Sequence, residues 1–314
     1  MSNGKLSNYE LKITMRINKL NDLPGELQGQ ARKRLVAVNA VDSHTIEAVS
    51  EAVDLGIVEG ILTGDPGKIK ETCTLLQIDP AKFEIVAANT EDEAALKAVH
   101  LISEGKAGLM MKGLLSTDKF MKALLNKEYG LLPPKGVLSH VAVMEIPTYH
   151  KLLIVSDVAI IPYPDLNQKI TMTGYLIRTA QALGIENPKV ALIAATEQVL
   201  PSMPACTDAA VIAKMADRGQ IPGGIVDGPL ALDVALDHEA ADVKKISSPV
   251  AGDADCLLFP NIDAGNVFYK MGTKLCKSEQ AAIVAGARVP VVLSSRGDTM
   301  QTKLYSIALA AMLS

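Results

Sequence analysis

Aromatic side chains are scarce in this sequence, which has no tryptophan and only 4% aromatic residues among its 314 residues. Hydrophobic residues still make up 48%, so aliphatic side chains must fill most of the core. Charged residues make up 21%, and no low-complexity segment or fixed-period repeat occurs. This composition argues against a disordered chain, and the length is sufficient for two domains.

Cysteine is also rare and scattered. Cys73, Cys206, Cys256 and Cys276 form no Cys-x-x-Cys pair, and no histidine lies near them at the spacing of a zinc site. We expect reduced cysteines that serve as packing residues, and we expect no metal site.

A strong excess of one charge is missing, since 31 basic residues stand against 35 acidic ones. No basic stripe is interleaved with aromatics, which argues against nucleic acid as a partner. No apolar run approaches the roughly 18 residues that cross a bilayer, and charges fall within residues 1–20 where a signal peptide has its apolar core. We therefore expect a cytoplasmic protein with no membrane partner.

Several catalytic motifs are absent. The segment Gly64–Lys68 resembles a phosphate loop only at its end, because Leu62 replaces the first glycine and Ile69 replaces the hydroxyl residue after the lysine. No Gly-x-Gly-x-x-Gly follows a predicted strand, and no Gly-x-Ser-x-Gly occurs. These absences argue against nucleotide hydrolysis, a Rossmann dinucleotide site and a serine hydrolase.

Short aliphatic runs alternate with amphipathic helical segments from Arg34 onward, which predicts an α/β fold with mostly parallel strands covered by helices. Asp42, Asp65, Thr90 and Ser116 are expected N-caps. Expected strands lie at 35–38, 56–62, 83–88, 107–111, 190–194, 224–226, 256–259 and 289–293, and expected helices at 43–53, 90–103, 116–125, 170–183, 208–216, 264–276 and 301–313.

The alternation is interrupted at Gly130–Gly136, after which the runs 139–146 and 152–155 read as an antiparallel pair. This change predicts a domain boundary near residue 136. The last strand, 289–293, is followed by a single helix and more naturally completes the first sheet. We therefore predict a discontinuous first domain, 1–136 with 286–314, and a second domain, 137–285. The first 30 residues are expected to form a helix or two on the outside.

Three segments in the second half combine acids, glycines and amides where the carboxyl ends of strands would form a crevice. They are 226–230, which contains Asp227, then 250–255, and 259–266. Each could equally be a turn, because these residue types favour turns.

A fourth segment runs from the last predicted strand into Ser294, Ser295, Arg296, Gly297 and Asp298. Asp298 or Thr299 is an expected N-cap of the following helix, so free backbone amides should lie beside Arg296. A guanidinium, a hydroxyl and a helix N-terminus suit a phosphate or an acyl phosphate. The alternative is that Arg296 forms a salt bridge at a strand end and the serines cap the helix.

Together these segments resemble the phosphate acetyl/butyryltransferase family. The motifs are Val-Asp-Gly-Pro-Leu-Ala-Leu-Asp at 226–233, Ser-Pro-Val-Ala-Gly-Asp-Ala-Asp at 248–255, Phe-Pro-Asn-Ile-Asp-Ala-Gly-Asn-Val-Phe-Tyr-Lys at 259–270 and Leu-Ser-Ser-Arg-Gly-Asp at 293–298. The resemblance covers about residues 34–314 and is strongest over the last third. The Asp-Gly-Pro-Leu-Ala-Leu-Asp form and the ending at 302–310 are more similar to the butyryl-transferring members than to the acetyl-transferring ones.

The resemblance implies transfer of an acyl group between coenzyme A and inorganic phosphate, by direct attack in a ternary complex. Coenzyme A is then a substrate, and no cofactor is implied. The implied fold has two three-layer α/β/α domains with mostly parallel sheets and an inter-domain cleft, as in isocitrate and isopropylmalate dehydrogenases. A homodimer joined through the second domain is also implied. A four-carbon acyl group is expected, with propionyl and branched groups accepted because one methylene discriminates only weakly.

The resemblance also implies site residues. The family's Ser-Arg pair falls on Ser295 and Arg296, which would donate a hydrogen bond to developing charge and clamp phosphate. Thr302 replaces an aspartate thought to be the base in the acetyl enzymes, so Asp298 is the candidate base, with helix capping as its alternative role. Further substrate-binding candidates are Asp227, Asn266, Lys270, Lys112, Ser116 and Thr117, and His140 could lie near the site.

Two other functions are alternatives to phosphate acyl transfer, whether the acyl group is butyryl or acetyl. One is a metal-dependent hydroxyacid dehydrogenase, which shares this architecture and would need a magnesium-binding cluster, for which Asp227, Asp253 and Asp255 are candidates. The other is a catalytically idle regulatory relative, against which the retained Ser295 and Arg296 argue.

Overall fold

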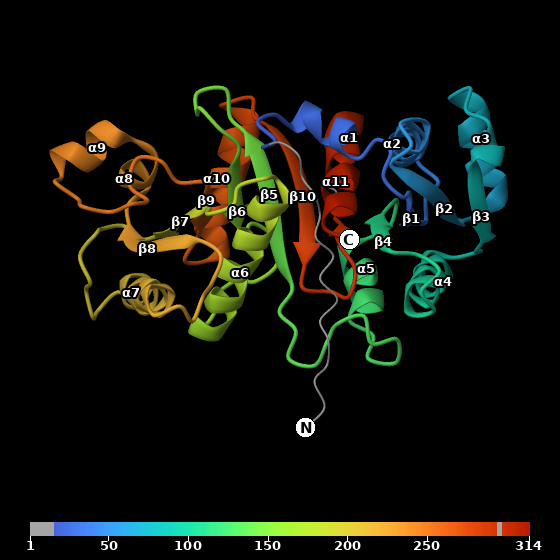
Figure 1. Cartoon of the computed structure of the whole chain (residues 1–314). Helices are drawn as coiled ribbons and strands as arrows, with labels where there is room; N and C mark the ends of the chain where they lie inside the picture. The colour runs from blue at the N-terminus through green and yellow to red at the C-terminus, as the bar shows by residue number, and fades with distance from the viewer. Residues whose placement is uncertain (1–15, 294–296) are drawn as a thin grey trace.

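One continuous sheet of eleven strands runs through the part of the chain described by the computed structural model, residues 16–293 and 297–314. Its strand order is β3-β2-β1-β4-β11-β10-β5-β6-β9-β7-β8 (Figure 1). The strands are β1 (Lys33–Val38), β2 (Val58–Gly64), β3 (Phe83–Ala87), β4 (Leu109–Lys112), β5 (Ser139–Glu145), β6 (Leu153–Ser156), β7 (Lys189–Ile193), β8 (Ile225–Leu230), β9 (Cys256–Leu258), β10 (Glu279–Ala285) and β11 (Val291–Val292).

Helices cover both faces of this sheet (Figure 1). The α-helices are α1 (Leu23–Glu26), α2 (Ser43–Asp54), α3 (Pro66–Leu75), α4 (Glu91–Ser103), α5 (Thr117–Leu124), α6 (Leu166–Ala182), α7 (Pro204–Asp217), α8 (Leu232–Leu236), α9 (His238–Val243), α10 (Ile262–Lys274) and α11 (Met300–Met312), and two 3-10 turns are η1 (Leu20–Asp22) and η2 (Pro80–Lys82). The predicted α/β class is therefore confirmed.

The predicted capping residues set where these helices begin. Asp42, Asp65, Thr90 and Ser116 each accept a hydrogen bond from a backbone amide in the first turn of their helix. These bonds satisfy amides that have no partner within the helix, so each helix starts at a defined distance from the strand before it.

The sheet consists of two parallel halves that meet in an antiparallel centre. Strands β3, β2, β1, β4 and β11 are mutually parallel, and so are β6, β9, β7 and β8. Between them, β10 runs antiparallel to β11 and β5, and β5 runs antiparallel to β6. The predicted antiparallel pair is confirmed, as is the placement of the last strand beside the first-half strand β4.

The predicted fold has two separate sheets, whereas the structure has one continuous sheet. The two differ because strand β10 was not predicted from the sequence. This strand pairs with β5 along its whole length and with β11 on its other side, which joins the halves into one sheet. Its sequence, Glu-Gln-Ala-Ala-Ile-Val-Ala, is rich in alanine, which has a weak strand preference. The predicted boundaries fall just before β5 and just after β10, and the division into two domains stays a prediction.

The two faces of the sheet are packed differently. On one face a single core extends across both halves, under α2, α3, α6, α7 and α11. On the other face the core is split into one cluster under α4 and α5 and another under α8, α9 and α10. Alternation along β5 shows the division, because Val141 and Val143 join the continuous core while Ala142 and Met144 join a split one. A space between α5 and α10 is therefore left unfilled by core side chains.

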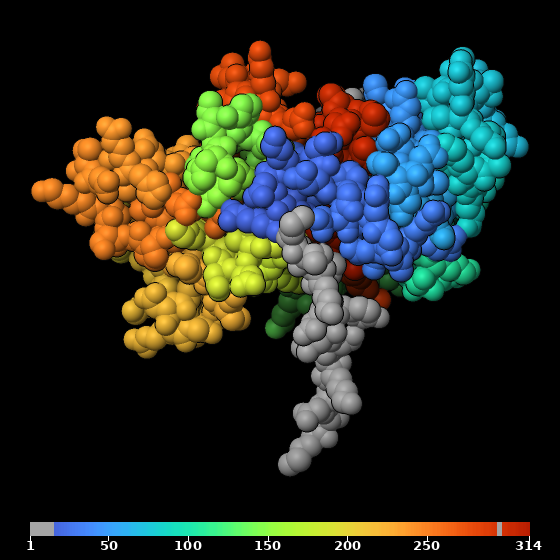
Figure 2. Space-filling view, turned by 45° about the horizontal axis from the view of Figure 1, so that its top comes forward, coloured from blue at the N-terminus to red at the C-terminus, as the bar shows by residue number. Residues whose placement is uncertain are grey.

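The described N-terminal segment lies across both halves (Figure 2, blue). The Ile17 amide donates to the Leu183 carbonyl, and the Leu20 amide donates to Glu145 Oε2 at 2.8 Å. Leu20 and Leu23 are fully buried in the continuous core. The segment from residue 16 thus contains the short turns η1 and α1 rather than long helices. No helix among the described residues is long and apolar enough to cross a membrane.

A cluster of charges stabilises the amino-terminal edge of the second half. Lys151 Nζ lies 2.8 Å from Asp253 Oδ1 and 2.8 Å from Asp255 Oδ1, and its side chain is only 8% exposed. Lys189 Nζ contacts Asp253 Oδ2 at 2.8 Å, and His150 Nε2 contacts Asp253 Oδ1 at 3.0 Å. The pKa of Asp253 reflects these contacts: burial opposes its charged form, but the three hydrogen bonds outweigh burial and lower the pKa.

We predict that Asp253→Asn lowers the free energy of unfolding by about 1–3 kcal/mol near pH 7, because charged hydrogen bonds are lost. Since the folded pKa lies below the unfolded one, this stabilisation is complete above about pH 5, begins to fall as the pH drops past the unfolded value near 3.9, and disappears only once the pH passes the lower folded pKa. Urea unfolding of the unmodified protein and the variant from pH 7 down to about pH 3.5 should show that the difference between their free energies of unfolding becomes smaller. A difference that stays constant would contradict the prediction.

The matched control is Asp217→Asn, which removes an exposed carboxylate paired with Lys214. Exposed pairs of this kind contribute at most about 1 kcal/mol.

Candidate active site

A cavity of about 530 Å³ lies between α5 and α10, where the two split cores leave space. Most of the predicted site residues that the structure describes line this cavity, and they come from both halves of the sheet. Those that line it are Lys112, Ser116, Thr117, Asn266, Lys270 and Asp298.

The first half contributes a lysine and a helix N-terminus. Lys112 is the last residue of β4 and is only 4% exposed. Ser116 caps α5 by accepting a hydrogen bond from the Lys119 amide, and Thr117 is the first residue of that helix. A buried ammonium group and the positive end of a helix dipole therefore face one cavity, which favours an anionic ligand.

The second half contributes one face of α10. Asn266, Tyr269 and Lys270 line the cavity, as the helical spacing of three and four residues allows. The Asn266 Nδ2 donates to the Val158 carbonyl at 2.8 Å, so this side chain fixes α10 to the loop after β6. Gly265 permits that contact, since a Cβ there would lie only 2.1 Å from the Asp157 carbonyl oxygen.

Asp157 organises the loop that forms this wall. It follows β6 and is 1% exposed. Its Oδ1 accepts hydrogen bonds from the Ala159 and Ile160 amides at 2.7 and 2.8 Å, and its Oδ2 accepts from Ser139 Oγ at 3.0 Å. The sequence analysis did not identify Asp157. An acid directly after a buried aliphatic strand is the signal that could have found it.

His140, next to Ser139 on β5, lines the cavity and is 4% exposed. Its backbone amide donates to Asp157 Oδ2 at 3.2 Å, and its ring meets the Tyr269 ring edge-on with 6.3 Å between centroids. Burial lowers the pKa of His140, which Asp157, the Leu293 backbone and Asp298 only partly oppose. Burial, together with the charge of Asp298, raises the pKa of Tyr269, so that residue keeps its proton.

The segment before α11 reaches the same cavity. Thr299 caps α11 by accepting a hydrogen bond from the Thr302 amide at 3.1 Å, so the cap is Thr299 rather than Asp298. Asp298 lines the cavity instead. Ser295 and Arg296 lie outside the described residues, and Leu293 and Asp298 on either side of them both line the cavity.

Two predicted segments lie elsewhere. Asp227 is within the edge strand β8, where its Oδ1 accepts from the Gly228 amide, and it does not line the cavity. The segment 250–255 precedes β9 and so lies at the amino ends of the strands, not at the carboxyl ends as predicted. Its acids, Asp253 and Asp255, pair with lysines. Within the described ranges, no group of three or more histidine, cysteine or acidic side chains is arranged to hold a metal.

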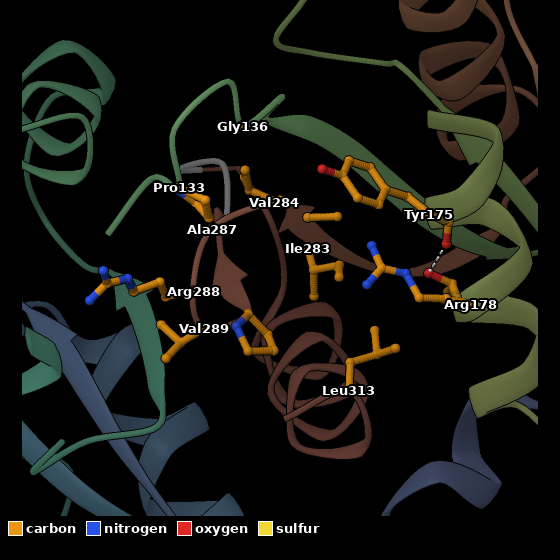
Figure 3. Close-up of a pocket in the computed structure, with 14 residues that line it drawn as sticks. Pro133, Gly136, Tyr175, Arg178, Ile283, Val284, Ala287, Arg288, Val289 and Leu313 are labelled. Carbon is orange, nitrogen blue, oxygen red and sulfur yellow. Dashed lines mark hydrogen bonds between the residues drawn. The ribbon is translucent and has the colours of Figure 1, made fainter. Parts of the chain in front are cut away.

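A second cavity, of about 470 Å³, lies between α6 and the turn that joins β10 to β11 (Figure 3). Arg178 and Arg288 lie on opposite sides of it, and Ile283, Val289 and Leu313 give it apolar walls. None of the predicted site residues lines it. The cavity between α5 and α10 is therefore the better candidate for chemistry.

The close approach of α10 to Asp157 can be tested by stability. We predict that Gly265→Ala lowers the free energy of unfolding by about 1–3 kcal/mol, because the added methyl group must displace either α10 or the Asp157 loop. Gly174→Ala in α6 is the matched control, since nothing lies within 4 Å of its Cβ and alanine favours helices. Urea unfolding of both variants should separate them, and equal stabilities would refute the close contact.

The chain is similar to known proteins over almost its whole length. The family model for phosphate acetyl/butaryl transferase matches residues 87–311. A phosphate butyryltransferase of Clostridium acetobutylicum is 46% identical over 95% of this chain and 98% of its own, and a phosphate acetyltransferase of Thermotoga maritima is 42% identical over 89% and 95%.

Among solved structures, a branched-chain phosphotransacylase from Enterococcus faecalis is 29% identical. It superimposes with a TM-score of 0.77 over 90% of this chain and 98% of its own. The resemblance that the motifs predicted is thereby confirmed, and this chain belongs to the phosphate acetyl/butaryl transferase family.

Proposed function

We propose that this chain transfers a short acyl group, with butyryl preferred, between coenzyme A and inorganic phosphate. The observation that carries the proposal is the cavity between α5 and α10, which is lined by predicted site residues from both halves of the sheet. The chain that contains this cavity belongs to this family. An acyl-CoA and a phosphate are both anionic, and the cavity presents Lys112, Lys270 and the N-terminus of α5.

The cavity also suits a short acyl chain. Leu115, Val158 and Leu293 line it beside the polar residues. An apolar wall next to cationic groups matches a substrate whose charged end and hydrocarbon end lie close together. The relatives named for butyryl and branched-chain transfer are consistent with that match.

In the proposed reaction a phosphate oxygen attacks the thioester carbonyl carbon, the carbon–sulfur bond breaks, and coenzyme A leaves with the electron pair. Attack within a ternary complex needs the two substrates held together, which a cavity built from both halves provides. Arg296 would clamp the phosphate, and Ser295 would donate a hydrogen bond to the developing oxyanion. The reaction involves no redox step, so the proposal includes no cofactor or metal.

Acetyl transfer is the second candidate, because the Thermotoga maritima relative named for it is 42% identical. A hydroxyacid dehydrogenase has no comparable support, since Asp253 and Asp255 are engaged by lysines. We also propose that the enzyme works as a homodimer in the cytoplasm, as the family resemblance leads us to expect.

The assignment is tested by release of coenzyme A thiol from butyryl-CoA, with and without phosphate. We predict release that requires phosphate and that falls by about 100-fold or more in Arg296→Ala, because a charged transition-state contact is lost. Arg218→Ala, at an exposed helix end, is the matched control and should keep full activity. Release without phosphate would indicate a thioesterase. Full activity in Arg296→Ala would show that phosphate is bound by other residues.

Chain length is tested with acetyl-, propionyl-, butyryl- and isobutyryl-CoA under the same conditions. We expect kcat/KM to be greatest for four-carbon chains and at least about 10-fold lower for acetyl-CoA, because each methylene that fills an apolar pocket contributes about 1–3 kcal/mol. A maximum at acetyl-CoA would favour the second candidate.

A further inference from the structure

The imidazole of His140 has a property that the proposed roles of the other residues do not use. Its Nδ1 is buried, and no described group within hydrogen-bonding distance satisfies it. Leaving a buried acceptor unpaired costs about 1–3 kcal/mol, so folded proteins seldom keep one without a function. This nitrogen belongs to a residue that lines the candidate active site.

The surroundings fix which ring nitrogen carries the proton. A hydrogen bond to the Leu293 backbone raises the pKa of His140, so it favours the protonated ring and is made by a ring N–H to a carbonyl. Because Nδ1 has no partner, we assign the proton of the neutral ring to Nε2, which leaves the lone pair of Nδ1 unused.

Charges from several elements surround this ring. Asp157 follows β6, Asp298 precedes α11, and Tyr269 meets the ring edge-on from α10. Lys112 lines the same cavity from β4. Burial is the largest influence and keeps the pKa of His140 below its usual value, so the ring is neutral near pH 7. A neutral imidazole with a bare nitrogen is a proton acceptor.

At the position where the family resemblance implies an aspartate in the acetyl enzymes, this chain has no carboxylate. Thr302 stands there, and its hydroxyl lies 3.1 Å from that of Thr299 in the first turn of α11. A threonine hydroxyl is far too weak a base to take a proton near neutral pH. A different group must therefore accept the proton if the reaction uses a base.

We propose that Nδ1 of His140 accepts the proton of the coenzyme A thiol during acyl transfer. The proposal rests on the proposed function and deepens it. As the S–H proton moves to Nδ1, the sulfur attacks the acyl carbon of the acyl phosphate. The bond from that carbon to the phosphate oxygen breaks, and phosphate leaves with the electron pair. The imidazolium then gives its proton to phosphate or to water.

In the opposite direction the same imidazolium supplies a proton to the departing thiolate. His140 therefore acts as base in one direction and acid in the other, as reversibility requires.

Asp298 is the competing base, since it also lines the cavity. The observation that favours His140 is its buried Nδ1, which has no hydrogen-bond partner among the described groups. The two candidates are separated by the variants below.

The test is the pH profile of kcat/KM for coenzyme A with butyryl phosphate as acyl donor, from pH 5.5 to 9. In the unmodified enzyme the rate should be independent of pH above about 6.5, because burial keeps the pKa of the base below that ordinary value and the base is neutral there. His140→Gln keeps an amide N–H for Leu293 but removes the base. It should lose about 100-fold or more at pH 7.

In that variant the loss in kcat/KM should become about 10-fold smaller for each pH unit up to the thiol pKa near 8.5, because more of the thiol is then already ionised and needs no base. His44→Asn is the matched control, because that histidine is exposed on the first turn of α2, and it should not change the profile. Asp298→Asn should lower the rate without moving the profile.

Equal losses at every pH in His140→Gln would show a structural role and overturn the proposal. So would a shifted profile in Asp298→Asn, which would make Asp298 the base. If His140→Gln does not fold, His140→Asn is the second variant, and losses that are equal at every pH in it likewise overturn the proposal. An unmodified enzyme that turns over no acyl phosphate contradicts the proposed function itself, whereas an active enzyme with unchanged variant profiles contradicts only the role of His140.

Discussion

The antiparallel pairing of β10 with β5 and β11 is the constraint on which the rest of the molecule depends. It joins two parallel half-sheets that run in opposite senses, and residues at the carboxyl ends of β4 and β6, one strand from each half, line the same cavity. Each half covers its own part of one face with its own helices, while the other face carries a shared core. The cavity exists because α5 and α10 belong to different halves and leave the centre of that face uncovered.

The site combines rigid and polar parts in a way that follows from this arrangement. Asp157 ties the start of β5 to the loop after β6, and Asn266 ties α10 to the same loop. Those contacts satisfy the local backbone, and the polar groups that line the cavity beside them include Lys270, the N-terminus of α5 and His140. Preorganised charges of this kind act on a reacting group without having to move first.

Local signals allowed most elements to be predicted from the sequence. The caps at Asp42, Asp65 and Ser116 each involve neighbours within three residues, so their chemistry is visible in a short window. The face formed by Asn266 and Lys270 follows from helical spacing. The family motif added Ser295 and Arg296, which lie outside the described residues.

Long-range packing decided what the sequence could not reveal. Strand β10 has a composition that favours strands only weakly and is held by partners on both sides. Asp253 looks like a strand-end acid, but its partner Lys151 is 102 residues away along the chain. Asp157 and His140 meet only because β5 and β6 turn back on each other. No window of adjacent residues contains that information.

The placement of β11 and α11 also determines the order in which the chain can fold. The first half of the sheet receives its fifth strand from residues 291–292, and α11 packs on α2 and β10. The turn α1 precedes every strand of the sheet and rests against α11, which follows every strand. A nascent chain therefore cannot complete its first half while the second is being synthesised, and β4 keeps an unpaired edge until β11 has left the ribosome. Closure over so long a loop is slow, and the exposed edge favours association with other chains during that interval.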